Sequence, residues 1–113
     1  MATEVDAQDA KLVTLARASM ARIGAKQGAA VRDLDGRSYA SGPVELASLS
    51  IGALELAVAQ AVAAGAKGLE AVAVVNVQDD AIVNLAVVRD LGGAGIPVHV
   101  ADAKGDVVRV LTS

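Results

Sequence analysis

The sequence contains no cysteine, no tryptophan and no phenylalanine, with a single tyrosine and a single histidine among its 113 residues. The absence of thiols excludes disulfides and fits a reducing compartment, so we expect a cytoplasmic protein. It also removes a common zinc ligand, and zinc is held by three or four N, S or O ligands. The composition therefore predicts a chain without a bound metal or other cofactor.

Basic residues are few and scattered. Ten lysines and arginines stand against thirteen acidic residues, and the net charge is −3. Nucleic-acid binding depends on clustered basic side chains that neutralise phosphates, so no nucleic-acid partner is expected. The N-terminal segment MATEVDAQDA is acidic and polar, and no signal peptide is expected. The most apolar window, residues 46–65, contains Glu55, which favours a buried helix over a membrane span.

Alanine and valine supply much of the apolar content, which makes up 54% of the chain. A chain of 113 residues is typically one domain, so we expect a single domain over residues 1–113. Small apolar side chains remove less surface from water than leucine or phenylalanine, and burial is worth about 25 cal/mol per Å². We therefore expect a marginally stable monomer that buries further surface in an oligomer.

The first element that the sequence predicts is a helix over residues 4–23. Thr3 is its expected N-cap, Asp6 follows three residues later as in a capping box, and Gly24 is the expected stop. Apolar side chains recur at three- and four-residue steps, as they do on one face of a helix. The members of this expected stripe are Leu12, Leu15, Ala16, Met20 and Ile23.

Two further helices are expected. Residues 53–64 are apolar almost all round, which predicts burial on several sides, and Gly65 ends the segment. Residues 81–91 are the third candidate, with Asp79 or Asp80 as its cap.

The remaining apolar runs predict strands. Asp35–Gly36 is a strong hairpin signal between residues 28–34 and 37–41, because glycine tolerates the positive φ of such turns. The other expected strands are residues 70–77, 96–101 and 107–111, the last two antiparallel. The resulting order is α-β-β-α-β-α-β-β. Strands alternating with helices indicate an α/β protein, a sheet with helices on its faces.

Several segments in this order carry a family pattern. They are Gly28–Ala29–Ala30–Val31, Asp35–Gly36, Tyr39, Val44–Glu45–Leu46–Ala47–Ser48, Gly52–Ala53–Leu54–Glu55–Leu56–Ala57 and Ala71–Val72–Ala73–Val74–Val75. They resemble the cytidine deaminase family, which typically shows V-G-A-A-L, a D-G turn, G-x-N-V-E-N-A-S, C-A-E-R-T-A and a strand like A-I-A-V-V. The resemblance covers nearly the whole chain. It implies a three-layer α/β/α cytidine deaminase-like fold with a five-stranded mixed sheet.

The sequence departs from this family at the catalytic motifs. Members use a zinc-bound water, whose pKa the metal lowers from 15.7 to about 7, and a glutamate that shuttles protons. Counting back from the helix end places Gly52 at the C-A-E cysteine, Leu54 at the glutamate and Glu55 at the arginine. A shift of one residue places Glu55 at the glutamate and Ala53 at the cysteine. Neither register supplies a metal ligand, and the shorter segment 80–91 lacks the family's P-C-x-x-C.

Residues that would contact a nucleoside are sparse. The resemblance implies that the asparagine and glutamate of N-V-E contact the ribose; Pro43 replaces the first and Glu45 retains the second. Glu45 and Tyr39, the single aromatic residue, are the candidate ligand contacts, although a solvated loop or helix-cap carboxylate is the favoured alternative for Glu45. His99 stands alone on an expected strand and is interpreted as a surface or core residue rather than a ligand.

Three functions remain open at this point. The favoured one is a non-catalytic cytidine deaminase-like protein that acts through assembly, since the resemblance implies a homo-oligomer, a dimer or tetramer, with a protein partner as a further option. The alternative is a pseudoenzyme that binds a nucleoside or another small molecule. The least favoured is a cytidine deaminase, a hydrolase acting on cytidine or deoxycytidine.

Overall fold

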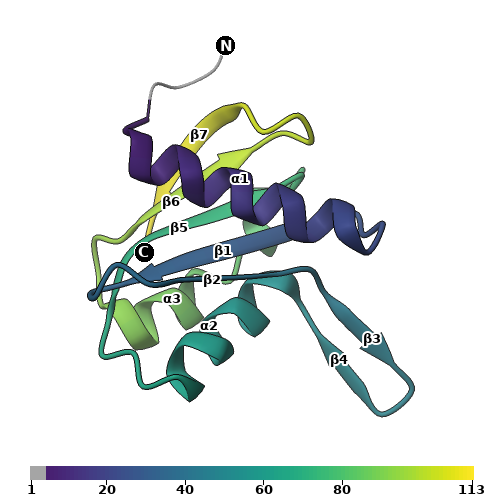
Figure 1. Ribbon diagram of the computed structural model, residues 1–113, viewed down its shortest axis with the longest axis horizontal. Helices are drawn as coiled ribbons and strands as arrows, with labels where there is room; N and C mark the ends of the chain where they lie inside the picture. The colour runs from purple at the N-terminus through teal and green to yellow at the C-terminus, as the bar shows by residue number, and fades with distance from the viewer. Residues whose placement is uncertain (1–4) are drawn as a thin grey trace.

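The computed structural model describes residues 5–113. Its helices are α1 (Ala7–Arg22), α2 (Ala53–Ala63) and α3 (Leu85–Gly92), with a 3₁₀ turn, η1 (Asp80–Ile82), ahead of α3. Its strands are β1 (Gly28–Asp33), β2 (Ser38–Ser41), β3 (Val44–Leu46), β4 (Leu49–Ile51), β5 (Leu69–Val75), β6 (Pro97–Ala101) and β7 (Val107–Thr112). Figure 1 shows their arrangement.

The main sheet has five strands in the order β2-β1-β5-β6-β7. Its β5–β6 pair is parallel, and the other neighbouring pairs are antiparallel. The parallel pair exists because α3 lies between these strands in the chain and forms the crossover that parallel strands need. The predicted five-stranded mixed sheet is confirmed, and so is the hairpin around Gly36, whose φ is 82°.

Helices cover both faces of this sheet and make three layers. Helix α1 lies over one face, and α2 and α3 lie over the other (Figure 1). Strand β5 contributes side chains to the cores on both faces of the sheet, as its apolar sequence predicts, because alternate side chains point to opposite faces. Val72 and Val74 pack with α2, while Ala73 and Val75 pack with α1.

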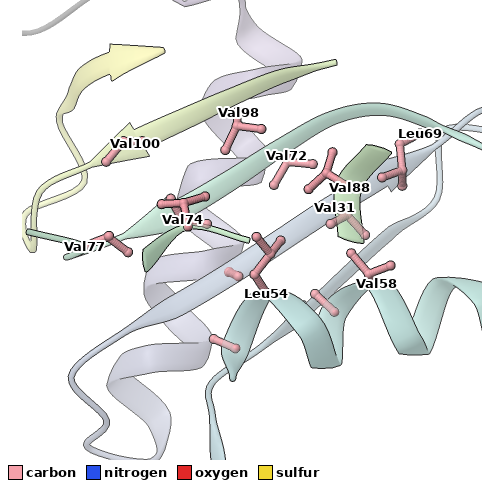
Figure 2. Close-up of a cluster of buried hydrophobic side chains, with 14 of the residues drawn as sticks. Val31, Leu54, Val58, Leu69, Val72, Val74, Val77, Val88, Val98 and Val100 are labelled. Atoms are coloured by element: carbon pink, nitrogen blue, oxygen red, sulfur yellow. The ribbon is translucent and has the colours of Figure 1, made fainter. Parts of the chain in front are cut away.

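The core beneath α2 and α3 is built almost entirely of aliphatic side chains. Figure 2 shows Leu54 and Val58 of α2 facing valines of the sheet, with Val88 of α3 beside them. Alanines at 57 and 61 are fully buried on the same side of α2. Small residues on this helix face let α2 approach the sheet closely, which is how a chain with a single aromatic residue fills its interior.

Helix α1 differs from its prediction in its cap and in its buried face. Asp6 is the N-cap, and its side chain accepts a hydrogen bond from the Asp9 N–H at 2.9 Å. Thr3 lies outside the described residues. Val13 is buried in place of Leu15, which is exposed along with Ile23. The inward face is set by where the sheet lies, and both faces of this helix offer apolar side chains.

The prediction of one helix over residues 81–91 is wrong in its first half. Asp79 caps η1 by accepting the Ala81 N–H at 2.9 Å, and Val83 is extended. Helix α3 then begins at Leu85, after the N-cap Asn84, whose side chain accepts the Val87 N–H at 3.1 Å. Asparagine side chains compete with helical hydrogen bonds in this way, which apolar periodicity does not reveal.

Residues 44–51 form a hairpin that the sequence analysis does not predict. Strands β3 and β4 pair with Val44 opposite Ile51 and Leu46 opposite Leu49. They make a separate two-stranded sheet that projects from the body of the molecule (Figure 1). Its turn, Ala47–Ser48, has none of the Asn-Gly or Asp-Gly chemistry that signals a hairpin. Glu45 therefore lies on an exposed strand and not in a loop.

The composition of α2 predicts burial on several sides, but the helix is buried on one side only. Val62 is 55% exposed, and Ala59 and Ala63 are exposed as well. This leaves an apolar outer face on a helix with one charged residue, Glu55. Among residues 5–113, no helix has the length and apolar character needed to cross a membrane.

Candidate functional site

A cleft of about 610 Å³ lies between the loop that leaves α1 and the base of the hairpin β3–β4. Residues 23–27 form one wall, and the hairpin and the start of α2 form the other. Its charged lining residues are Lys26 and Glu45, one from each wall, and Gln27 and Ser50 add polar groups. The cleft can therefore offer both hydrogen-bond donors and acceptors to a bound molecule.

Asn76 holds the α1 side of this cleft in place. It follows β5 in the left-handed conformation, with φ 64°, which asparagine adopts more readily than most residues. Its Nδ2 donates to the carbonyl oxygen of Lys26 at 2.7 Å, and its Oδ1 accepts from Gln78 at 3.0 Å. The cleft wall is thereby tied to the end of a central strand, where α/β sheets commonly bind ligands.

A smaller pocket of about 160 Å³ adjoins the cleft, and Gln27 and Gly52 line both cavities. Its walls are the start of β1, the start of α2, the end of β5 and residues 82–84. Leu54 faces the sheet with 6% of its surface exposed and contributes to the apolar wall. The volume is close to that of a roughly 150 Å³ cavity that holds a single benzene ring. A nucleoside would need the adjoining cleft as well.

The residues at the C-A-E position meet at the boundary of these two cavities. Gly52 is the N-cap of α2 and Glu55 lies in its first turn. The Glu55 carboxylate folds back over Gly52 and accepts a hydrogen bond from Asn84 Nδ2 at 3.2 Å. The structure thus brings together Gly52, Leu54 and Glu55, which the sequence analysis singles out, and adds Asn84, which it does not.

His99 lies on the opposite face of the sheet from these cavities. Its Nε2 is 2.8 Å from Oδ2 of Asp9 on α1, and its side chain is buried. Asp9 in turn accepts a hydrogen bond from Arg32 at 2.8 Å. The histidine is therefore engaged in the α1 core.

The zinc centre that the family resemblance implies does not fit the side chains present. Within residues 5–113, no group of three His, Cys, Asp or Glu side chains lies close enough together to hold a metal ion. Around the inner pocket the donors are one carboxylate, Glu55, and the amides of Asn84 and Gln27. Zinc prefers imidazole and thiolate ligands, and this set has neither.

Tyr39 does not line either cavity. Its hydroxyl donates to Oδ2 of Asp33 at 3.0 Å, and the other oxygen of Asp33 accepts the N–H groups of Asp35 and Arg37. Burial by itself would raise the pKa of Asp33, but these hydrogen bonds outweigh it and lower the pKa. Burial and the bond to Asp33 both raise the pKa of Tyr39. This arrangement fixes the β1–β2 turn, and a ligand contact at Tyr39 stays a prediction.

Several lining residues were missed by sequence reasoning, among them Lys26, Gln27 and Asn84. Gln27 directly precedes β1, and Asn84 directly precedes α3. Positions just outside strands and helices commonly carry binding side chains because they sit on loops held by a rigid scaffold. That placement was the available signal, but it becomes specific only when the boundaries of β1 and α3 are known.

A comparison with protein-family models matches residues 5–105 to the model described as "Cytidine deaminase-like". No match was found in the comparison with curated proteins. Among solved structures, the chain is similar to cytidine deaminase from Burkholderia pseudomallei, with 29% identity, a TM-score of 0.74, and 90% of each chain covered.

A second similar structure is cytidine deaminase from Mycobacterium leprae. The identity is 24%, the TM-score is 0.67, and the match covers 95% of this chain and 94% of that chain. At this identity the likeness shows the fold alone. Together these findings confirm the three-layer α/β/α fold that the sequence resemblance implies.

Proposed function

Because this chain belongs to the cytidine deaminase-like family, we propose that it is a member that does not deaminate and that acts by assembling with further copies of itself. The observation that supports the first half is the start of α2, where counting back from the helix end puts Gly52 and Leu54 at the family positions of the metal ligand and the proton carrier. Without a metal, the pKa of an attacking water stays far above neutrality, at about 15.7.

The register that places Glu55 at the proton-carrying position does not rescue this chemistry. In that register the Glu55 carboxylate lies at the inner pocket, but Ala53 stands at the position of the metal ligand. No imidazole or thiolate lies nearby among the described residues. A general base contributes about 10²- to 10⁴-fold on its own. That is small beside the acceleration of an enzyme, which is at least about 10⁶-fold.

Exposed apolar side chains support the assembly half of the proposal. Leu46 and Leu49 lie opposite each other near the tip of the hairpin and are 66% and 48% exposed. An isolated two-stranded hairpin is marginally stable in water. Val62 on the outer face of α2 adds a second apolar surface. Exposed apolar surface of this kind marks interaction sites, and a partner would stabilise both features.

The assembly is tested by light scattering on purified protein. We expect a dimer or tetramer at micromolar concentration, and a shift toward the monomer in the double variant Leu46→Ser/Leu49→Ser. The matched control is Leu34→Ser. Leu34 is 60% exposed and lies in the β1–β2 turn, outside the β3–β4 hairpin. A wild-type protein that runs as a monomer would contradict the assembly proposal.

The absence of catalysis is tested separately. Metal analysis of the purified protein should find no stoichiometric zinc, and incubation with cytidine or deoxycytidine should release no uridine or deoxyuridine. Zinc bound in equal amount together with turnover would establish an active deaminase instead, whatever the oligomeric state.

One observation favours a second candidate, a pseudoenzyme that binds a nucleoside or related small molecule. The cleft and the inner pocket are contiguous, and Glu45, the retained N-V-E glutamate, lines the cleft. A ligand that binds the native state raises its melting temperature. Cytidine, uridine and deoxycytidine at millimolar concentration should do so for the wild type and less for Glu45→Ala. No shift with any of them would remove this candidate.

A further inference from the structure

The helices α2 and α3 begin next to each other, and one side-chain hydrogen bond joins their first turns. Glu55 lies in the first turn of α2, and Asn84 is the N-cap of α3. Asn84 uses both ends of its amide: Oδ1 accepts the Val87 N–H at 3.1 Å, and Nδ2 donates to Oε2 of Glu55 at 3.2 Å. The amide is therefore oriented by its own helix when it reaches the carboxylate.

Gly52 makes room for this arrangement. Its φ of −69° is open to any residue, so backbone conformation does not require glycine there. A β-carbon at position 52 would lie 2.4 Å from Oε1 of Glu55. The carboxylate is the free end of a flexible side chain, so a methyl group would push it away from Asn84 and leave the helix in place.

The electrostatics of the two helix starts also favour this position of the carboxylate. The N-terminus of a helix carries roughly half a positive charge and stabilises an anion beside it. Two such ends converge here, and Gly52 offers α2 no capping side chain. Glu55 is the single charged residue among those that line the inner pocket. Its carboxylate is the acidic group of the first turn of α2, and it also lies beside the start of α3, which has no acidic residue in its own first turn.

We propose that the Glu55–Asn84 hydrogen bond replaces, in this chain, the metal centre as the link between the starts of α2 and α3. In the family pattern the zinc ligands come from C-A-E and P-C-x-x-C, which correspond here to residues 52–54 and to the shortened segment before α3. A metal ion would join the same two places. This inference rests on the proposed absence of a metal, since a metal ion in this pocket would take the carboxylate as a ligand.

The test uses the variant Asn84→Asp. Aspartate caps helices as well as asparagine does, so the cap on Val87 is kept and the exchange should cost nothing in capping. It removes the amide donor, however, and sets a second carboxylate against Glu55. We expect the melting temperature to fall by about 4 °C or more, the shift that corresponds to about 1 kcal/mol in a domain of this size.

The double variant Glu55→Gln/Asn84→Asp reverses the direction of the hydrogen bond, because the amide is then at position 55 and the carboxylate at position 84. It should recover most of the loss. Gly52→Ala is a milder probe that leaves both partners unchanged: it should lower the melting temperature, and Asn84→Asp should then have little further effect. Asp90→Asn, at an exposed position of α3 that lines neither cavity, is the matched control and should be neutral.

A neutral Asn84→Asp variant, or a double variant in which the two effects simply add, would overturn the inference. Metal analysis separates this failure from that of the proposed function. Stoichiometric zinc in the wild type contradicts both, whereas metal-free protein without coupling between positions 55 and 84 contradicts the inference alone.

Discussion

Oδ2 of Asp9 lies 2.8 Å from Nε2 of His99, and this contact joins α1 to β6 on the face of the sheet opposite the cavities. Asp9 also accepts a hydrogen bond from Arg32 at 2.8 Å, and Arg32 reaches Glu70 at 3.3 Å. Burial alone would lower the pKa of Arg32, but its contacts with Asp9 and Glu70 outweigh it and raise the pKa. The side chain that ties the network together is Asp9.

Removing Asp9 should destabilise the fold. Within residues 5–113, Nδ1 of His99 and Nη1 of Arg32 are already buried without a hydrogen-bond partner. Asp9→Ala would strip both side chains of a further partner, and breaking a buried ion pair costs about 3 kcal/mol. Urea unfolding measures the loss, with Asp90→Ala, at an exposed position of α3, as the control. Equal stability of the two variants would contradict the role given to Asp9.

The Asp33 carboxylate should make the fold sensitive to acid. Its folded-state pKa is lowered, so its contribution is complete above the unfolded value of about 3.9 and is lost as the pH falls through the folded value. Asp33→Ala should therefore be less stable than the wild type near neutral pH, and the difference should narrow at about pH 3. Urea midpoints measured across this range test it. A difference that does not change with pH would refute the assignment.

Position 57 should not accept a larger side chain. Ala57 is fully buried between α2 and the sheet, and forcing extra methylenes into a packed interior costs about 2 kcal/mol. Ala57→Leu should therefore lower the free energy of unfolding by about that amount. Ala59→Leu, two positions along on the exposed side of the same helix, should change it by less than about 0.5 kcal/mol. Similar effects at both positions would show that α2 does not pack as described.

Gly28 should be equally intolerant for a different reason. A β-carbon at this position would lie 2.2 Å from the carbonyl oxygen of Ala16, in the backbone of α1. Backbone cannot rotate out of the way, so Gly28→Ala should force α1 off β1 and cost about 3 kcal/mol. Thermal unfolding monitored by circular dichroism measures the loss of stability, as a fall in the temperature at which the helical signal disappears. An unchanged melting curve would mean that α1 sits farther from the sheet.

The order of the local elements follows from the sequence because their signals are local. A stripe at three- and four-residue steps locates α1, apolar runs locate α2 and the main strands, the Asp35–Gly36 turn fixes the first hairpin, and Gly65 ends α2. Family motifs along the chain, such as Gly28–Ala29–Ala30–Val31, indicate the three-layer fold. The lack of cysteine is a property of the composition alone.

Only the tertiary structure decides the relationships on which the site depends. Glu55 and Asn84 are 29 positions apart, and Asp9 and His99 are 90 apart, so no local pattern links them. The hairpin β3–β4 and the true start of α3 escape prediction because their turn residues and caps give weak signals until their surroundings are known. Which face of α1 turns inward is likewise a property of the packed sheet. Sequence periodicity fixes the conformation of a segment, whereas contacts between distant segments follow from how those segments pack against one another.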